Sequence, residues 1–103
     1  MAYALIITTC PDRESAEQVT KYLLENRLAA CVQRLPVEST YLWQGEIVHD
    51  TEITLFIKTR AILFAEISAQ IREVHPYELP EIIALPIADA LPAYLQWIDD
   101  CTQ

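Results

Sequence analysis

The stretch His75–Glu81, with the sequence HPYELPE, decides how the chain is organised, because it joins a helical pattern to the plainest buried-strand pattern. Its prolines, Pro76 and Pro80, fix their own φ angles and push the residues before them toward an extended conformation. The stretch therefore predicts a stiff, extended connector. It is also the only place in the chain where a histidine, a phenol and two carboxylates fall within seven residues, so it is the first candidate for chemistry.

A helix and a strand are predicted on the two sides of this connector. Residues 60–74 carry apolar side chains at helical spacing, and Thr59 is placed to cap that helix. The helix has to end before Pro76, because proline disfavours the helical conformation in the residue before it. After the connector, Glu81–Leu85 is predicted to be a buried strand that Pro86 ends.

The N-terminal half predicts a strand, a helix and a long hairpin. Tyr3–Thr9 is an apolar run typical of a buried strand, and Asp12 is a candidate N-cap for a helix over residues 13–27. The predicted hairpin has an outgoing extended arm over residues 28–43, a turn at Gln44-Gly45 and a return arm over residues 46–58.

A last helix is predicted over residues 90–101, with Asp89 as its cap and Pro92 in its first turn, where a missing N–H costs least. The predicted order is β-α-β-β-α-β followed by this extra helix. That order is typical of an α+β, ferredoxin-like split βαβ arrangement. Because the chain has 103 residues and no internal linker or repeat, residues 1–103 are predicted to form a single domain.

One face of the predicted sheet is left without helices. In a ferredoxin-like sheet both crossover helices lie on one face, toward which Ile53, Leu55 and Ile57 are expected to point. The other face would carry aromatic and β-branched side chains, namely Tyr41, Trp43, Thr54 and Phe56. An exposed face of this kind and an apolar edge strand predict association between chains. The alternative is a monomer whose third helix covers the open face.

Composition narrows the classes of function. A net charge of −8 argues against a nucleic-acid partner, and a single glycine excludes the phosphate-cradling loops that need several. No apolar run approaches the roughly 20 residues that a membrane span needs. The three cysteines, at positions 10, 31 and 101, lack the paired spacing of a disulfide framework. They predict reduced thiols and a cytoplasmic location.

Five blocks of the sequence match a known family. They are LAACV at residues 28–32, STYLWQGEI at 39–47, Glu52 with Lys58-Thr59, HPYELPEIIA at 75–84 and YLQWI at 94–98. Each block alone is a weak signal. Together, in this order and over essentially the whole chain, they closely resemble the CutA-type divalent-cation tolerance proteins.

The resemblance implies a tight homotrimer of ferredoxin-like subunits, with the long hairpin reaching between subunits. It also implies a role in tolerance of copper and other divalent cations, and direct copper binding has been proposed for the family. The trimer is similar to that of the PII signalling proteins, which bind small ligands between subunits.

The resemblance also implies positions for metal ligands. In one branch of the family the proposed copper ligands are a cysteine at the end of the first strand and a His-His pair before Pro-Tyr. By position these fall on Thr8, Val74 and His75, so one of the three is kept. Cys10 lies two residues from Thr8, which keeps it on the same face of an extended strand. Cys10 is therefore a candidate replacement for the family cysteine.

His75, Cys10 and Glu78 form the predicted metal site. Imidazole, thiolate and carboxylate groups suit a borderline cation such as Cu(II) or Zn(II). One histidine with such partners gives at most a weak, exchangeable site unless a second subunit contributes. The alternative is a histidine at a helix end, favourable at the negative end of the dipole and hydrogen-bonded to a carboxylate.

A second candidate site is a cleft between subunits. Lys58, Glu52 and Glu81 are expected to be the least exposed charged residues, which requires them to pair across a subunit boundary. The functional alternative is a cleft that binds a small anion or metabolite. Its predicted lining is Lys58, Glu52, Tyr77, Glu81, Trp43 and Trp97. The aromatic residues are also typical of an ordinary interface core.

The chain carries no serine nucleophile elbow, no H-E-x-x-H motif and no catalytic carboxylate pair with a cofactor motif, so an enzyme is not predicted. Two hypotheses remain. The first is a cytosolic homotrimer for divalent metal tolerance that binds metal weakly through His75 and Cys10. The second is a PII-like sensor or scaffold whose intersubunit cleft binds a small molecule or a protein partner.

Overall fold

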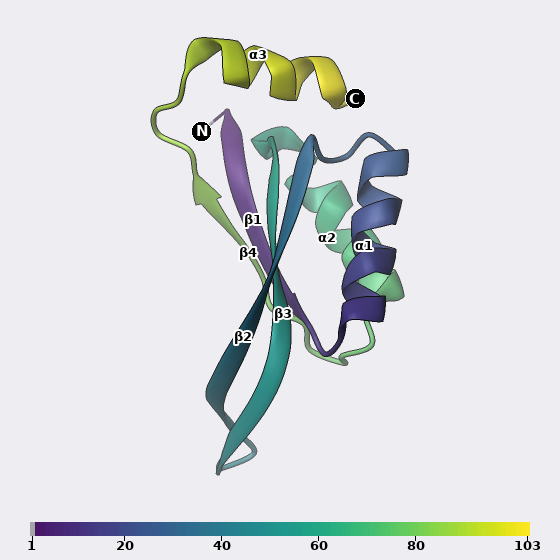
Figure 1. Ribbon diagram of the computed structural model, residues 1–103, viewed down its shortest axis with the longest axis vertical. Helices are drawn as coiled ribbons and strands as arrows, with labels where there is room; N and C mark the ends of the chain where they lie inside the picture. Colours follow the sequence, from purple (N-terminus) through teal and green to yellow (C-terminus); the bar gives the residue numbers. More distant parts are fainter. Residues whose placement is uncertain (1) are drawn as a thin grey trace.

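The computed structural model of the protein describes residues 2–103, in which four strands form one antiparallel sheet (Figure 1). The elements in chain order are β1 (Tyr3–Cys10), α1 (Arg13–Glu25), β2 (Cys31–Trp43), β3 (Glu46–Arg60), the 3-10 turn η1 (Ala61–Leu63), α2 (Phe64–Val74), β4 (Ile82–Pro86) and α3 (Pro92–Cys101). The sheet order is β2-β3-β1-β4, so β2 and β4 are its edges. The predicted element order, with its extra C-terminal helix, is confirmed.

Helices α1 and α2 lie on one side of the sheet and build the core with it (Figure 1). Alternate residues of β1 are buried on this side, namely Ala4, Ile6, Thr8 and Cys10. Leu55 and Ile57 of β3 are fully buried there too, as predicted, because β3 pairs with β1 in a register that places them opposite Thr8 and Ile6. The even-numbered residues of β1 therefore face the helices, and the odd-numbered ones face the other way.

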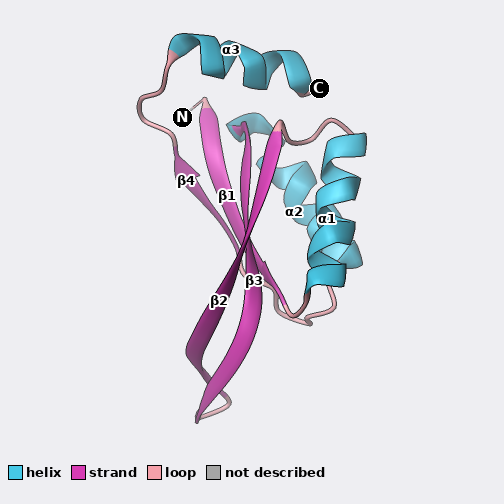
Figure 2. Cartoon of the chain, in the orientation of Figure 1, coloured by secondary structure: helices cyan, strands magenta, loops and turns pink. Residues whose placement is uncertain are grey.

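Strands β2 and β3 form a hairpin that extends well beyond the rest of the sheet (Figure 2). Every residue of β2 from Cys31 to Trp43 is paired with β3, and the longest dimension of the molecule is 45 Å. At the hairpin tip, Gln44 and Gly45 have φ angles of 51° and 80°. Positive φ at both central residues is what a tight two-residue hairpin turn requires, so the predicted turn is confirmed.

The first helix begins as predicted. The Asp12 carboxylate accepts a hydrogen bond from the Ser15 backbone N–H at 2.8 Å. This bond favours the ionised form and lowers the pKa of Asp12. The helix ends at Glu25, two residues before the predicted end, because Arg27 adopts a positive φ of 54° that breaks the helical path.

The other two predicted helix N-caps, unlike Asp12, are wrong. Thr59 does not cap a helix, because β3 continues to Arg60 and the buried Thr59 hydroxyl donates to the Leu28 carbonyl at 2.6 Å. Asp89 does not cap α3 either. The residue before the first turn is Leu91, whose side chain makes no capping bond, and the helix starts at Pro92.

Helix α3 covers only one end of the second face of the sheet. It lies across that end (Figure 1), where Ile98 is fully buried and the Tyr3 hydroxyl donates to Asp99 at 2.7 Å. Farther along, the side chains of Leu35, Ile83 and Leu85 remain 50%, 47% and 41% exposed. The third helix therefore leaves much of the open face uncovered.

Candidate functional site

The connector between α2 and β4 packs against the end of β1. His75 ends α2 with an extended backbone, and its N–H donates to the Ile71 carbonyl at 2.8 Å. Strand β4 then pairs with β1 from Ile82, opposite Thr8, onward. The helix end and the strand pairing hold the connector at both ends, and its first side chain, His75, is only 7% exposed.

Both ring nitrogens of His75 are engaged by the main chain. Nε2 lies 2.6 Å from the Thr9 carbonyl, and Nδ1 lies 3.1 Å from the Tyr77 backbone N–H. Because a carbonyl only accepts and an N–H only donates, Nε2 carries the proton and Nδ1 is the acceptor. The predicted carboxylate partner of a helix-end histidine is therefore wrong, since the partners are backbone groups.

Cys10 is buried beside this histidine. Its Sγ lies 3.8 Å from His75 Nε2, and the side chain is 0% exposed. Burial disfavours the thiolate and raises the pKa of Cys10 to about 11. Thr8 points to the same side of β1, and its buried Oγ1 has no hydrogen-bond partner among the described residues. The structure thus brings Cys10 and His75 together.

Glu78 does not join this pair. Its side chain is exposed, and no hydrogen bond links it to Cys10 or His75. Within residues 2–103, no three His, Cys, Asp or Glu side chains are grouped closely enough to hold a metal ion. A single chain therefore supplies two neighbouring ligand side chains at this position.

A second cluster forms where the connector meets the hairpin. The Tyr77 hydroxyl donates to Glu52 Oε2 at 2.8 Å, and Glu52 is only 6% exposed. Desolvation, followed by the hydrogen bond to Glu52, raises the pKa of Tyr77 well above its ordinary value. Tyr77 therefore keeps its proton and holds the buried carboxylate in place.

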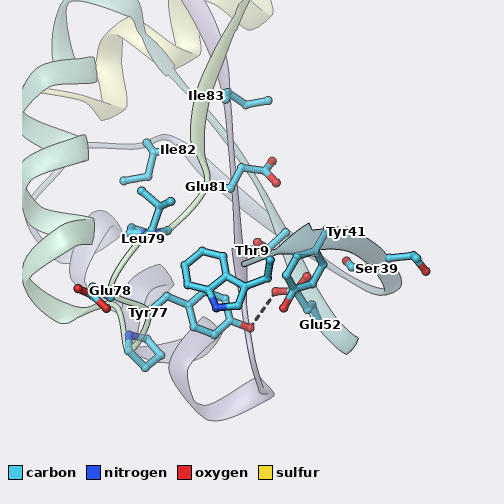
Figure 3. A pocket seen from close by; sticks show the side chains of 14 residues that line it. Thr9, Ser39, Tyr41, Glu52, Tyr77, Glu78, Leu79, Glu81, Ile82 and Ile83 are labelled. Atoms are coloured by element: carbon cyan, nitrogen blue, oxygen red, sulfur yellow. Dashed lines mark hydrogen bonds between the residues drawn. The ribbon is translucent and has the colours of Figure 1, made fainter. Parts of the chain in front are cut away.

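This cluster forms part of a groove of about 930 Å³ between the hairpin and the connector (Figure 3). The groove is lined by Thr9, Ser39, Thr40, Tyr41, Trp43, Glu52 and residues 76–83. Figure 3 shows Glu52, Tyr41 and Tyr77 gathered on one side, whereas Glu78 points away from them. Four of the six residues predicted for a cleft, Trp43, Glu52, Tyr77 and Glu81, thus lie together within one chain.

The other two predicted cleft residues lie elsewhere. The Lys58 ammonium lies 5.6 Å from the centroid of the Tyr94 ring on α3, and Trp97 packs on the same tyrosine at 5.4 Å between ring centroids. Both are at the end of the sheet that α3 covers. Within one chain Glu52 is buried and Lys58 half-buried, whereas Glu81 is exposed and lies just before β4, which begins at Ile82. Their burial at a subunit boundary stays a prediction.

Sequence reasoning missed two contributors to these sites. The first is the Thr9 carbonyl, a backbone group that carries no sequence signal. The second is Tyr41, which donates to Asp50 across the hairpin and lines the groove. The alternation of β2 placed Tyr41 on the open face. Pairing the two hairpin arms back from the Gln44-Gly45 turn would have placed it on the same face as Glu52.

None of the helices in residues 2–103 is long and apolar enough to cross a membrane.

Comparison with known proteins identifies a family. The family model described as CutA1 divalent ion tolerance protein matches residues 4–101. The "Divalent-cation tolerance protein CutA" of Thermus thermophilus is 42% identical over 99 residues, which cover 95% of this chain and 96% of that protein. "Protein CutA" of Mus musculus is 41% identical over 92% of this chain, but the match spans 54% of the mouse protein.

A solved structure has the same fold. The structure from Archaeoglobus fulgidus, described as the "Periplasmic divalent cation tolerance protein CutA", superposes with a TM-score of 0.96 at 40% identity. The superposition covers 98% of this chain and 99% of that one. The sequence and structural matches agree, and the chain belongs to the CutA1 divalent ion tolerance protein family.

Proposed function

We propose that this protein acts in tolerance of divalent cations, copper among them, by binding the metal directly and weakly rather than by catalysis. The observation that supports the proposal is the contact between Cys10 and His75, with Sγ and Nε2 3.8 Å apart. Two ligands bound at tetrahedral angles to one ion, with Zn–S and Zn–N bonds of ordinary length, lie about 3.6 Å apart. The two side chains are therefore spaced as ligands of one ion.

The same contacts explain why binding should be weak. A metal at His75 Nε2 displaces the proton that now bonds to the Thr9 carbonyl. That proton cannot move to Nδ1 without facing the Tyr77 N–H. A metal at Cys10 requires the thiolate, and burial raises the pKa of this thiol to about 11. Glu78 is the third proposed ligand and has to swing in from the exposed side of the connector, unless a second subunit supplies a group.

Calorimetric titration with Cu(II) and Zn(II), run beside native mass spectrometry, tests the proposal and gives the number of ions per assembly. His75→Ala and Cys10→Ala should each lower the copper affinity by at least about 10-fold. Wild-type affinity should rise with pH because metal binding releases the thiol proton. Unchanged copper affinity in His75→Ala would show that the site is assigned to the wrong residues.

We further propose a ferredoxin-like homotrimer in the cytoplasm as the functional form. Support for assembly comes from the uncovered face of the sheet, where Leu35, Ile83 and Leu85 are exposed, and from the long hairpin that projects beyond the helices. An intersubunit ion pair between Lys58 and Glu52 or Glu81 belongs to the same proposal, because within one chain Lys58 contacts Tyr94 instead.

A second candidate function is a PII-like sensor or scaffold that binds a small ligand or a protein partner at the intersubunit cleft. The groove beside Glu52, Tyr77, Glu81 and Trp43 favours it, because a volume of about 930 Å³ is large enough for a small organic ligand. A crystal structure of the assembly would test it. Ligand density in this groove would support the function, and a groove filled by side chains of the neighbouring subunit would exclude it.

A further inference from the structure

His75 is held in one tautomer by contacts that lie within the chain. Its Nε2–H donates to the Thr9 carbonyl at 2.6 Å, and its Nδ1 accepts from the Tyr77 backbone N–H at 3.1 Å. The histidine is 7% exposed, and Cys10 beside it is 0% exposed, in the single chain. The surroundings of both side chains are therefore set by this chain alone, whichever group covers the open face of the sheet.

Tyr77 joins this buried pair to the hairpin. Its backbone N–H bonds to His75, and its hydroxyl donates to Glu52 Oε2 at 2.8 Å, the dashed line in Figure 3. The rings of His75 and Tyr77 also pack together, with their centroids 4.9 Å apart. Desolvation, followed by the bond to Glu52, raises the pKa of Tyr77, so the phenol keeps the proton that it donates. Tyr77 is thus fixed at its backbone by His75 and at its side chain by β3.

This anchoring opposes the binding of a metal ion at His75. The imidazole nitrogen that binds a metal carries no proton, so a neutral ring bound through Nε2 holds its proton on Nδ1. There the proton faces the Tyr77 N–H, which is also a donor. The repulsion is relieved when the Tyr77 main chain moves away, and the bond from its hydroxyl to Glu52 resists that movement.

From these contacts we propose that Tyr77 is a positioning residue that limits the metal affinity of the Cys10–His75 pair. Together with Glu52 it keeps a donor on Nδ1 and the proton of His75 on Nε2, the atom that faces Cys10. The inference rests on the proposed function, direct binding of a divalent cation at this pair, and adds the contact that regulates it. Releasing the Tyr77 hydroxyl should therefore strengthen metal binding rather than weaken it.

The test compares two variants that each remove one bond from a phenol to a carboxylate. Tyr77→Phe removes the bond to Glu52. Tyr3→Phe, the matched control, removes the bond that Tyr3 donates to Asp99 at 2.7 Å, at the opposite end of β1 from Cys10. Calorimetric titration with Zn(II), which does not oxidise the thiol, should give an affinity about 5-fold higher than wild type in Tyr77→Phe and an unchanged affinity in Tyr3→Phe.

The tautomer of His75 supplies a readout in the absence of metal. Nitrogen NMR of the imidazole ring distinguishes the protonated nitrogen from the unprotonated one. The chain has two histidines, so the signals of His75 are those that disappear in His75→Ala. The wild type and Tyr3→Phe should carry the proton on Nε2 alone, whereas Tyr77→Phe should show a mixture of the two tautomers. A general loss of stability would not move this proton between the ring nitrogens.

Glu52→Gln decides the question if Tyr77→Phe does not fold. An amide oxygen is a weaker acceptor than a carboxylate, so the Tyr77 hydroxyl is held less firmly. The substitution also removes a negative charge, which by itself would lower the affinity for a cation. A rise in Zn(II) affinity of about 3-fold would therefore support the anchoring, and a fall would contradict it.

Contrary results separate this inference from the function on which it rests. If His75→Ala lowers the Zn(II) affinity but Tyr77→Phe does not raise it, the inference alone fails. An equal rise in Tyr3→Phe would trace the effect to a loosened fold and would also overturn the inference. If His75→Ala leaves the Zn(II) affinity unchanged, the proposed function fails, and the effect on affinity fails with it. The tautomer, measured without metal, then still shows whether Tyr77 holds His75.

Discussion

At the scale of single residues, the end of β1 concentrates polar groups in an apolar core. Thr8, Cys10 and His75 are all buried, and only His75 has both of its polar atoms satisfied by well-placed partners. Buried polar groups without partners lower stability. These residues therefore set how the free energy of unfolding responds to substitution and to pH.

Thr8→Val should stabilise the protein by about 1 kcal/mol, because valine has the same shape and removes a buried hydroxyl that has no partner within residues 2–103. Thr59→Val is the matched control. The Thr59 hydroxyl donates to the Leu28 carbonyl at 2.6 Å, so the same change there should destabilise by about 1–2 kcal/mol. Chemical denaturation of the two variants measures both signs, and a loss of stability in Thr8→Val would contradict the assignment.

Cys10 should make the protein less stable in alkaline solution. Its pKa is raised to about 11 in the folded state from an ordinary value of 9.0, so the protonated thiol is favoured by folding. The free energy of unfolding is therefore unaffected by Cys10 below about pH 9. It falls as the pH rises through 11, by up to about 2.5 kcal/mol. When the free energy of unfolding is measured by denaturation between pH 8 and 11, its decline with pH should be shallower in Cys10→Ala. An unchanged slope would mean that other groups, such as Tyr77, account for the loss.

The resemblance to the family pointed to Thr8 and His75 as ligand positions, and strand alternation added Cys10, because residues two apart on a strand share a face. It could not show that His75 is satisfied by the Thr9 carbonyl and the Tyr77 N–H. Those bonds depend on how the connector folds back on β1, and backbone groups look alike in every sequence. The hydrogen-bond partners of buried side chains are the part of a site that sequence patterns describe least.

At the scale of elements, local signals were reliable where the backbone itself imposes the conformation. Proline ended α2 and opened the connector, and the Gln44-Gly45 turn closed the hairpin. The caps assigned to Thr59 and Asp89 failed, since a cap depends on where the preceding segment stops. Pairing with Tyr3 extends β3 to Arg60 and carries Thr59 into the sheet.

The hairpin turn offers a gain in stability. Gln44 adopts a φ of 51°, which costs energy for most residues but little for asparagine. Gln44→Asn should therefore stabilise the protein by about 0.5 kcal/mol. Gln33→Asn, the same change within β2, should destabilise slightly, because asparagine is disfavoured in strands. Thermal unfolding of both variants checks the pair, and a lower melting temperature in Gln44→Asn would argue against this turn geometry.

At the scale of the whole molecule, the sheet has one face covered by α1 and α2 and one face only partly covered by α3 (Figure 1). The alternation of apolar residues predicted both faces. It could not predict how far α3 reaches, because that depends on the irregular segment between β4 and α3 rather than on a repeating pattern. Nor could it separate Lys58 from Glu52, which lie on one face of β3 but at opposite ends of the sheet.

Substitution on the open face tests whether it is an interface. Ile83→Glu places a carboxylate on that face, where burial against another chain would cost several kcal/mol, so the proposed trimer should dissociate at micromolar concentration. Ile62→Glu makes the same change on η1, at a side chain that is 79% exposed and away from the sheet, and should leave the trimer intact. Native mass spectrometry measures the oligomeric state of both variants. A trimer that survives Ile83→Glu would place the interface elsewhere.

The two edge strands have a consequence for how the chain is made. Before the proposed assembly forms, β2 and β4 each present a row of unpaired backbone donors and acceptors beside an apolar face, a template for uncontrolled strand addition. Refolding should then include a step that speeds up with protein concentration, in competition with aggregation. A newly synthesised chain would be at its most vulnerable when few copies are present, so its yield should depend on the rate of expression as well as on its sequence.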